Sequence, residues 1–259
     1  MEFKTLLFEK DAGIGILTLN RPKQLNAING EMLTELSNAM DNIAADDEVK
    51  VLIITGGEKV FAAGGDIAFM SGADSLTAES FIALCHQAFD KVANLEKPVI
   101  AAIAGMALGG GCELSLCCDI RICSENATFA QPEINLGIIP GAGGTQRLAR
   151  LIGPGWCKYL TMLGDPIDAD TALRLGLVAK VVPLDQLLSE AKKMAARLAA
   201  KPPVALRVLK KAINYGMNVD LASGLAFEQK VFALLFSTQD QKEGMKAFME
   251  KRKPVYKGR

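Results

Sequence analysis

The chain has 259 residues, of which 50% are hydrophobic and 22% charged, and its 29 basic side chains balance its 29 acidic ones. Without a basic excess the sequence does not resemble a dedicated nucleic-acid binder, which neutralises phosphates with lysine and arginine. The large hydrophobic share argues against intrinsic disorder. With a single histidine, His86, a multi-histidine metal site is not expected, and proton transfer is expected to depend on carboxylate, lysine, tyrosine or cysteine side chains. His86 lies in a helical pattern without a nearby acid, which predicts a surface or packing residue.

Cysteine spacing also argues against a metal. Four of the six cysteines fall within twelve residues, but they lack the C-x2-C pairs of structural zinc sites. We therefore expect reduced, buried thiols, which are typical of a cytoplasmic protein. The four are Cys112, Cys117, Cys118 and Cys123.

Residues 99–118 are almost all small or apolar and are long enough to span a membrane. They also contain three consecutive glycines and the ionisable Glu113, so we expect a buried strand, a glycine turn and a buried helix instead. The first eleven residues lack the basic-then-apolar pattern of a signal peptide. The sequence thus predicts no membrane segment.

Predicted strands and predicted helices alternate along the first two-thirds of the chain. Alternating residues predict a β-hairpin first, and helical spacing and buried apolar runs then take turns. This order indicates an α/β fold built from stacked ββα units. The predicted strands are 5–9, 14–19, 50–56, 98–104, 120–123 and 128–130, and the predicted helices are 30–46, 77–95 and 144–152.

From residue 184 onward the pattern is almost wholly helical, with helices predicted over 184–200, 203–215, 221–236 and 240–251. We therefore divide the chain into a core, residues 1–198, that carries the active site, and a C-terminal helical region, residues 199–259. The apolar residues Leu221, Leu225, Phe232 and Leu235 are consistent with either a core or an interface.

Two glycine-rich turns follow buried strands, one at residues 64–65 and one at 109–111. Glycine lets the backbone approach a ligand closely and leaves main-chain N–H groups free to donate. One donor from each turn can converge on a carbonyl oxygen, which is the requirement for an oxyanion hole. The alternative is that the glycines serve only tight packing of strand on helix.

Two glutamates lie among apolar residues, Glu113 in the first turn of the helix after residue 109, and Glu133 after Gln131-Pro132. A carboxylate in such surroundings is unfavourable unless it is paired or functional, and burial raises its pKa towards neutrality, which suits general acid/base catalysis. The alternative is that each accepts capping hydrogen bonds. No G-x-G-x-x-G, Walker, G-x-S-x-G or H-E-x-x-H motif occurs, so neither a nicotinamide nor a flavin is expected.

With these motifs in this order the chain resembles the crotonase superfamily, and specifically the enoyl-CoA hydratases, over essentially its whole length. The resemblance implies a spiral of ββα units with a C-terminal helical trimerisation region that also covers the acyl-CoA site. It further implies self-association as a trimer or a dimer of trimers. The runs that carry it are 19–27, 62–67, 107–113, 131–133, 137–148 and 247–253.

The resemblance implies that the backbone N–H groups of Gly65 and Gly110 hold the thioester oxygen of an acyl-CoA. Position 65 is usually alanine in the family, and the exchange to glycine keeps the main-chain donor. Glu113 and Glu133 are implied to hold one water molecule. One takes its proton as the oxygen attacks C3, and the other supplies a proton to C2; which is acid and which is base stays open.

By the same resemblance the substrate is a short-chain trans-2-enoyl-CoA, hydrated reversibly, and coenzyme A enters as part of that substrate with no separate cofactor. Met70 is implied to border the acyl pocket. The alternatives are isomerisation, hydration of a cyclic or branched enoyl-CoA, or a non-catalytic binding protein. The implied CoA contacts are Lys23, Leu25, Ala27, Ala63, Asp66, Ile67 and Lys251.

Overall fold

The computed structural model describes residues 3–259. Met1 and Glu2, which begin the segment inspected for a signal peptide, lie outside the described residues. Six strands form the main sheet, in which β1 pairs antiparallel with β2 and the other neighbours run parallel. In spatial order they are β1 (Leu6–Asp11), β2 (Ile14–Leu19), β3 (Val51–Thr55), β5 (Val99–Ile103), β7 (Ile120–Ser124) and β10 (Lys180–Val182).

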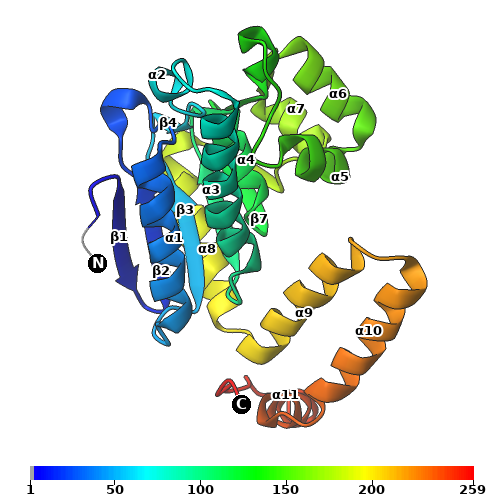
Figure 1. Cartoon of the computed structure of the whole chain (residues 1–259). Helices are drawn as coiled ribbons and strands as arrows, with labels where there is room; N and C mark the ends of the chain where they lie inside the picture. Colours follow the sequence, from blue (N-terminus) through cyan, green and yellow to red (C-terminus); the bar gives the residue numbers. More distant parts are fainter. Residues whose placement is uncertain (1–2) are drawn as a thin grey trace.

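A second, smaller sheet consists of four short strands. Three strands of the main sheet, β3, β5 and β7, are each followed by a short strand of this sheet and then by helix, so they open three successive ββα units (Figure 1). The spiral expected from the sequence is therefore confirmed. The short strands are β4 (Val60–Ala62), β6 (Met106–Leu108), β8 (Thr128–Ala130) and β9 (Ile167–Asp168).

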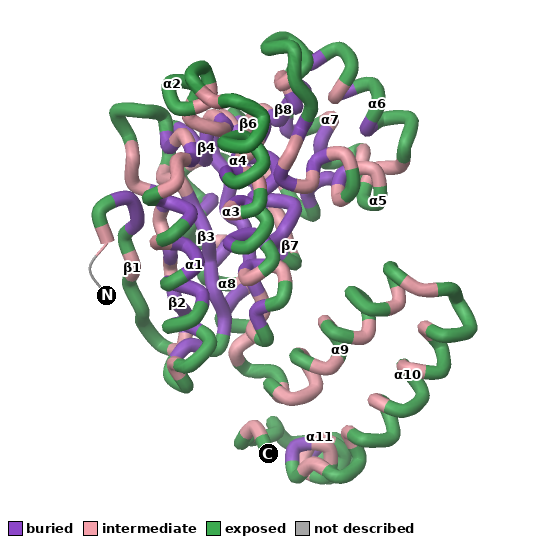
Figure 2. The backbone as a smooth tube through the Cα atoms, in the orientation of Figure 1, coloured by how far each residue is buried: buried purple, intermediate pink, exposed green. Residues whose placement is uncertain are grey.

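Helices cover both faces of the main sheet, and this explains why its central strands are apolar throughout. Every residue of β3 and β5 is buried. Side chains alternate between the faces, so that Leu52 joins the cluster under α1 (Gly30–Ala45) and α3 (Ser75–Asn94), whereas Ile53 joins the cluster under α8 (Leu187–Ala199). Figure 2 shows this buried interior running through the sheet.

The helix expected over residues 144–152 begins as a wide π-type turn at Gly144–Leu148 and becomes regular only in α5 (Ala149–Ile152). Gly143 precedes this turn with a φ of 118°, which suits glycine, and the backbone N–H of Gly144, the first of the turn, donates to the Glu113 side chain. Two further helices of this region, α6 (Pro154–Leu163) and α7 (Ala169–Arg174), were not predicted.

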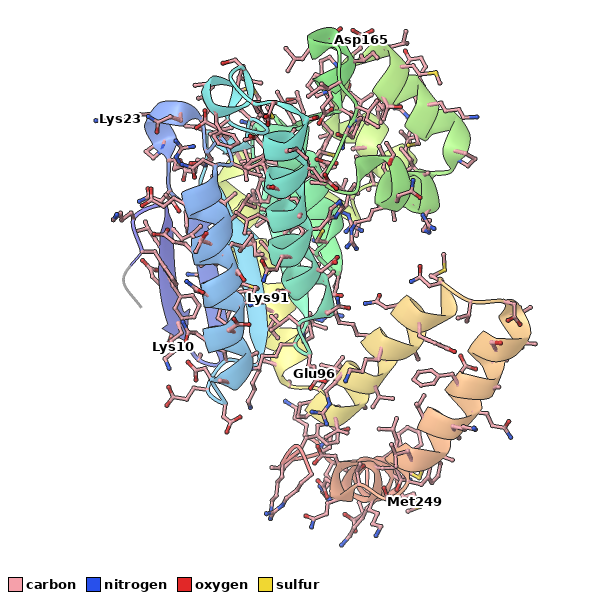
Figure 3. The ribbon with its side chains drawn as sticks, in the orientation of Figure 1. Lys10, Lys23, Lys91, Glu96, Asp165 and Met249 are labelled. Atoms are coloured by element: carbon pink, nitrogen blue, oxygen red, sulfur yellow. The ribbon has the colours of Figure 1, made fainter. Side chains whose placement is uncertain are left out.

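Three C-terminal helices project from the core, α9 (Pro203–Gly216), α10 (Leu221–Leu235) and α11 (Gln239–Met249) (Figure 1). Their attachment is partly ionic, because Lys210 Nζ on α9 lies 2.9 Å from the Asp119 carboxylate and two other basic side chains of α9 pair with Glu96 (Figure 3). The helix α8 before them packs on the main sheet and ends at Ala199, one residue past the expected boundary of the core.

The burial expected for the cysteines and the surface position expected for His86 are confirmed. All six thiols are free and buried, and His86 is exposed on α3. Within residues 3–259, no three side chains of the types that bind metals gather into a possible site. The apolar run 99–118 forms β5, β6 and α4 (Gly110–Leu116), and no helix of the described chain is long and apolar enough to cross a membrane.

Candidate functional site

The two glycine turns meet at the start of α4. Gly64 and Gly109 have φ values of 106° and 47°, which side chains with a Cβ rarely adopt. Gly111, two residues after Gly109, packs so closely on β4 that a Cβ there would lie 2.2 Å from the carbonyl oxygen of Ala62. Glycine at these positions therefore lets α4 begin directly against the neighbouring turn.

Two backbone N–H groups lie side by side at this junction without protein acceptors. A Cβ built on Gly110 would be 3.6 Å from the backbone nitrogen of Gly65, so the two turns are in contact. Neither N–H donates a hydrogen bond within residues 3–259; Gly110 is the first residue of its helix, where no earlier carbonyl is in reach. The pair can therefore donate together to one oxygen of a bound molecule.

Glu113 lies three residues into α4 and is 2% exposed. Its Oε1 accepts hydrogen bonds from the backbone N–H groups of Ala142 (2.8 Å) and Gly144 (2.7 Å). Burial raises the pKa of this carboxyl above its ordinary value, while the two N–H donors counteract the rise. The charged form thus receives two specific hydrogen bonds in an otherwise apolar place.

Glu133 follows β8, in the short 3-10 helix Pro132–Leu136, and its Oε1 lies against Gly109. Burial raises the pKa of Glu133 to about 7, and the charge of Glu113 adds to the rise. With its amide nitrogen turned towards Glu133, the buried side chain of Gln131 lies 3.2 Å from both carboxylate oxygens. Glu133 is therefore set to exchange a proton near neutral pH.

Both carboxyls and both glycine turns line one cavity of about 100 Å³. The rest of its wall is largely apolar. It is lined by buried and half-buried residues of α3 and by exposed residues of the 136–139 loop. The α3 residues are Phe81, Ile82, Cys85 and Phe89.

Most of the remaining residues expected from the sequence lie near this cavity. Met70, Ala63 and Ile67 line it, and the Met70 Cε would lie 3.1 Å from a Cβ on Gly65. Lys23 and Leu25 are exposed on the adjacent loop, where Figure 3 shows Lys23 at the outer edge of the molecule.

The other three residues expected to contact CoA are Asp66, Ala27 and Lys251, and none of them lines the cavity. The Asp66 carboxylate pairs with Arg21 at 3.1 Å, and Ala27 is half-buried with its carbonyl bonded to the same guanidinium. Lys251 follows α11, whose last residue, Met249, lies at the opposite end of the molecule from Lys23 (Figure 3). No residue after Ala142 lines the cavity, so the C-terminal helices do not cover it within this chain.

Sequence reasoning missed Gln131 and the N–H donors to Glu113. Gln131 stands directly before Pro132-Glu133, and a buried polar residue beside a candidate acid was the available signal. The donors at Ala142 and Gly144 are main-chain groups, so only the glycine-rich run 141–144 hinted at them.

Comparison with known proteins agrees with this geometry. The family described as enoyl-CoA hydratase/isomerase matches residues 9–259. A crotonyl-CoA hydratase of Syntrophomonas wolfei is 50% identical over 98% of both chains, and a short-chain-enoyl-CoA hydratase of Clostridium acetobutylicum is 48% identical over 98% of this chain and 97% of its own. The crystal structure of an enoyl-CoA hydratase from Bacillus anthracis superposes with a TM-score of 0.95 at 41% identity, covering 99% of this chain and all of the other.

The family match spans nearly the whole chain, and the identity with these relatives extends over the same residues. The resemblance drawn from the sequence motifs is thus confirmed, and the fold is shared with the Bacillus anthracis structure. The chain is a member of the enoyl-CoA hydratase/isomerase family, within the crotonase superfamily.

Proposed function

We propose that the protein catalyses the reversible addition of water to a short-chain trans-2-enoyl-CoA, giving the 3-hydroxyacyl-CoA. The observation that carries the proposal is the meeting of the buried Glu113 carboxyl, the half-buried Glu133 carboxyl and two free backbone N–H groups in one small cavity. An isomerase or a thioester hydrolase needs only part of this set. The names of the relatives from Syntrophomonas wolfei and Clostridium acetobutylicum support hydration.

The N–H groups of Gly65 and Gly110 act on the thioester oxygen. When water adds at C3, electrons move through C2 towards this oxygen, which becomes enolate-like and negatively charged. Two preorganised donors stabilise that charge more than they stabilise the neutral thioester, so they lower the barrier. Losing one such donor typically raises a barrier by ~2.7–4 kcal/mol.

Hydrogen bonding separates the roles of the two glutamates. Glu113 receives two N–H donors on one oxygen, which favours its carboxylate, and we assign it as the base that takes the water proton while the water oxygen bonds to C3. Glu133, with a pKa of about 7, is assigned as the acid that gives its proton to C2. One water is added in total, and proton exchange between the two carboxyls restores the starting state.

Cavity size supports a short acyl chain. An apolar cavity of roughly 150 Å³ holds one benzene molecule, which corresponds to about 25 Å³ per carbon. The cavity of about 100 Å³ therefore accommodates about four carbons, the length of a crotonyl group. The relatives named for crotonyl-CoA and for short-chain enoyl-CoA are consistent with this limit.

Coenzyme A is proposed to enter beside Lys23, Leu25 and Ala27, with Ala63, Asp66 and Ile67 on the adjoining turn. Lys251 follows α11, and the last residue of α11, Met249, lies at the opposite end of the chain from Lys23 (Figure 3), so contact of Lys251 with the CoA phosphates requires self-association, which we propose to be a trimer or a dimer of trimers. Exposed apolar side chains on α10 and α11, among them Leu221 (77%) and Phe248 (86%), support such an interface. The six free thiols support a cytoplasmic location.

The test is a turnover panel of straight-chain enoyl-CoAs from four carbons upward, followed by loss of the conjugated enoyl absorbance. We expect the highest kcat/KM for crotonyl-CoA and a severe loss of kcat in Glu113→Gln and Glu133→Gln, with CoA binding retained. Activity within a few-fold of wild type in either variant would refute the assignment. Double-bond migration without hydration would indicate an isomerase, preference for cyclic or branched substrates another hydratase, and salt-dependent RNA affinity without turnover a binding protein.

A further inference from the structure

Residues 21–28 run alongside the turn that carries Gly65. The backbone N–H of Ile28 donates to the carbonyl of Gly64 at 2.8 Å, and the Ile28 carbonyl accepts from the N–H of Asp66 at 2.9 Å. These two bonds hold the residues on either side of Gly65 and leave its own N–H free. The position of Ile28 therefore determines the direction in which the Gly65 N–H points.

Asn26 holds this segment in a conformation that most residues avoid. Leu25 and Asn26 have φ values of 52° and 56°, in the left-handed region. The buried Asn26 side-chain nitrogen lies 3.1–3.2 Å from three carbonyl oxygens of the segment 56–61, and its oxygen accepts from the Arg21 N–H at 2.9 Å. A strained loop that is fixed at so many points is able to hold its neighbours in one geometry.

Arg21 joins the loop to the residue after Gly65. Its guanidinium donates to the carbonyl of Ala27 and to the Asp66 carboxylate, at 3.1 Å from the latter, and the two charged side chains are only 15% and 20% exposed. A planar guanidinium with two acceptors fixes both their spacing and their orientation. It also neutralises a carboxylate that lies one residue from the Gly65 donor.

We propose that Arg21, acting through Asp66 and Ala27, is a positioning residue of the oxyanion hole. It keeps the Gly65 N–H directed at the thioester oxygen and cancels the Asp66 charge, which otherwise opposes the negative charge that develops there. The inference rests on the proposed function for its reaction, while the geometry of the hole can be tested without turnover. Arg21 acts through other groups and does not contact the reacting atoms.

The ion pair and its geometry predict how the loss of kcat ranks among three variants. Arg21→Met leaves the carboxylate of Asp66, the residue after Gly65, without its ion pair, and we expect kcat for crotonyl-CoA to fall about 10- to 100-fold with KM changed by no more than about two-fold. Asp66→Asn removes the charge as well as the ion pair, so its loss of kcat is smaller. The double variant Arg21→Met/Asp66→Asn is expected to be more active than Arg21→Met alone, because the repulsive charge is gone.

Polarisation of the bound carbonyl gives a readout that is independent of turnover. Butyryl-CoA labelled with ¹³C at the thioester carbonyl lacks the double bond and is not hydrated, and its infrared carbonyl band is expected to shift to lower frequency on binding the wild type. The shift should shrink in Arg21→Met and recover in part in the double variant. Glu190→Gln is the matched control, since it breaks a 2.7 Å ion pair with Lys180 on the other side of the main sheet and leaves the band unchanged.

Several outcomes overturn the proposal. A raised KM with unchanged kcat in Arg21→Met means that Arg21 binds CoA instead, and lost kcat with an unchanged carbonyl band means that the hole does not depend on it. If Arg21→Met does not fold, Asp66→Asn with its band decides the same question. If the wild type does not hydrate crotonyl-CoA, the proposed function fails, whereas the band comparison still tests the positioning role.

Discussion

Replacing Glu133 by glutamine is expected to stabilise the protein at alkaline pH while it lowers hydration. Burial raises the pKa of this carboxyl from an ordinary 4.5 to about 7. The native state therefore keeps a proton that the unfolded state releases between these two values. Below pH 4.5 this carboxyl does not lower the free energy of unfolding. As the pH rises from 4.5 towards 7 the free energy of unfolding declines, and above pH 7 it stays lower by a constant amount.

The size of the effect follows from the same shift. A rise from 4.5 to about 7 corresponds to at most ~3 kcal/mol of unfolding free energy above neutrality. Glu133 is only half-buried, and solvent screening reduces the expected gain in Glu133→Gln to about 1–2 kcal/mol. Glutamine has nearly the same shape and keeps an oxygen that can accept from Gln131, so little else should change.

Urea denaturation at acid, neutral and alkaline pH measures this gain, at one protomer concentration because self-association contributes to stability. We expect the difference between Glu133→Gln and wild type to be near zero around pH 4.5 and largest around pH 9. Glu79→Gln, on the exposed side of α3, is the control and should show no such dependence. A gain that is equal at every pH, or a loss of stability at alkaline pH, would contradict the reasoning.

Three other predictions concern residues around the cavity and in the buried interior. Gly109→Ala should lower kcat about 100-fold in steady-state kinetics, because the new Cβ would lie 2.6 Å from a Glu133 oxygen, whereas Gly57→Ala, also at positive φ but with open space around it, should not. Asn26→Ala should lower the unfolding free energy by about 2–3 kcal/mol in urea titrations, since buried carbonyls lose a donor. The six cysteines should react with a thiol reagent only after unfolding, because each thiol is buried and its pKa is raised; rapid native labelling would contradict this.

The sequence predicted the long elements well because their periodicity is strong. The hairpin, α1, α3 and the buried strands β3 and β5 all lie within a few residues of their expected ranges. The second sheet was largely missed, since β4 and β6 have three residues each and such runs are too short to show alternation. Because these short strands lead into the glycine turns, their pairing, rather than their composition, brings the turns together.

The candidate site was predictable in its side chains but not in its main-chain partners. Glu113, Glu133 and the glycine turns are visible as unusual residues in apolar surroundings. The N–H donors at Ala142 and Gly144 belong to a segment about thirty residues further along the chain, and any residue type can supply such a group. Which glutamate receives them depends on the three-dimensional arrangement, and so the acid and base could not be assigned from sequence.

The pH dependence of turnover tests that assignment. If Glu133 is the acid, its protonated form is needed for proton transfer to C2, and kcat/KM for hydration should fall as the pH rises through about 7. Burial raises the pKa of Glu113 and its two N–H donors counteract the rise, and because a base acts in its charged form, protonation of Glu113 should remove activity as the pH falls. If kcat/KM instead increases as the pH rises through 7, Glu133 is the base and Glu113 the acid, because a base must first lose its proton. The variant Glu133→Asp separates the two declines in the pH profile of kcat/KM. Because its carboxyl is on a shorter side chain, the decline near pH 7 should move to another pH. The decline at acid pH that is due to Glu113 should stay in place.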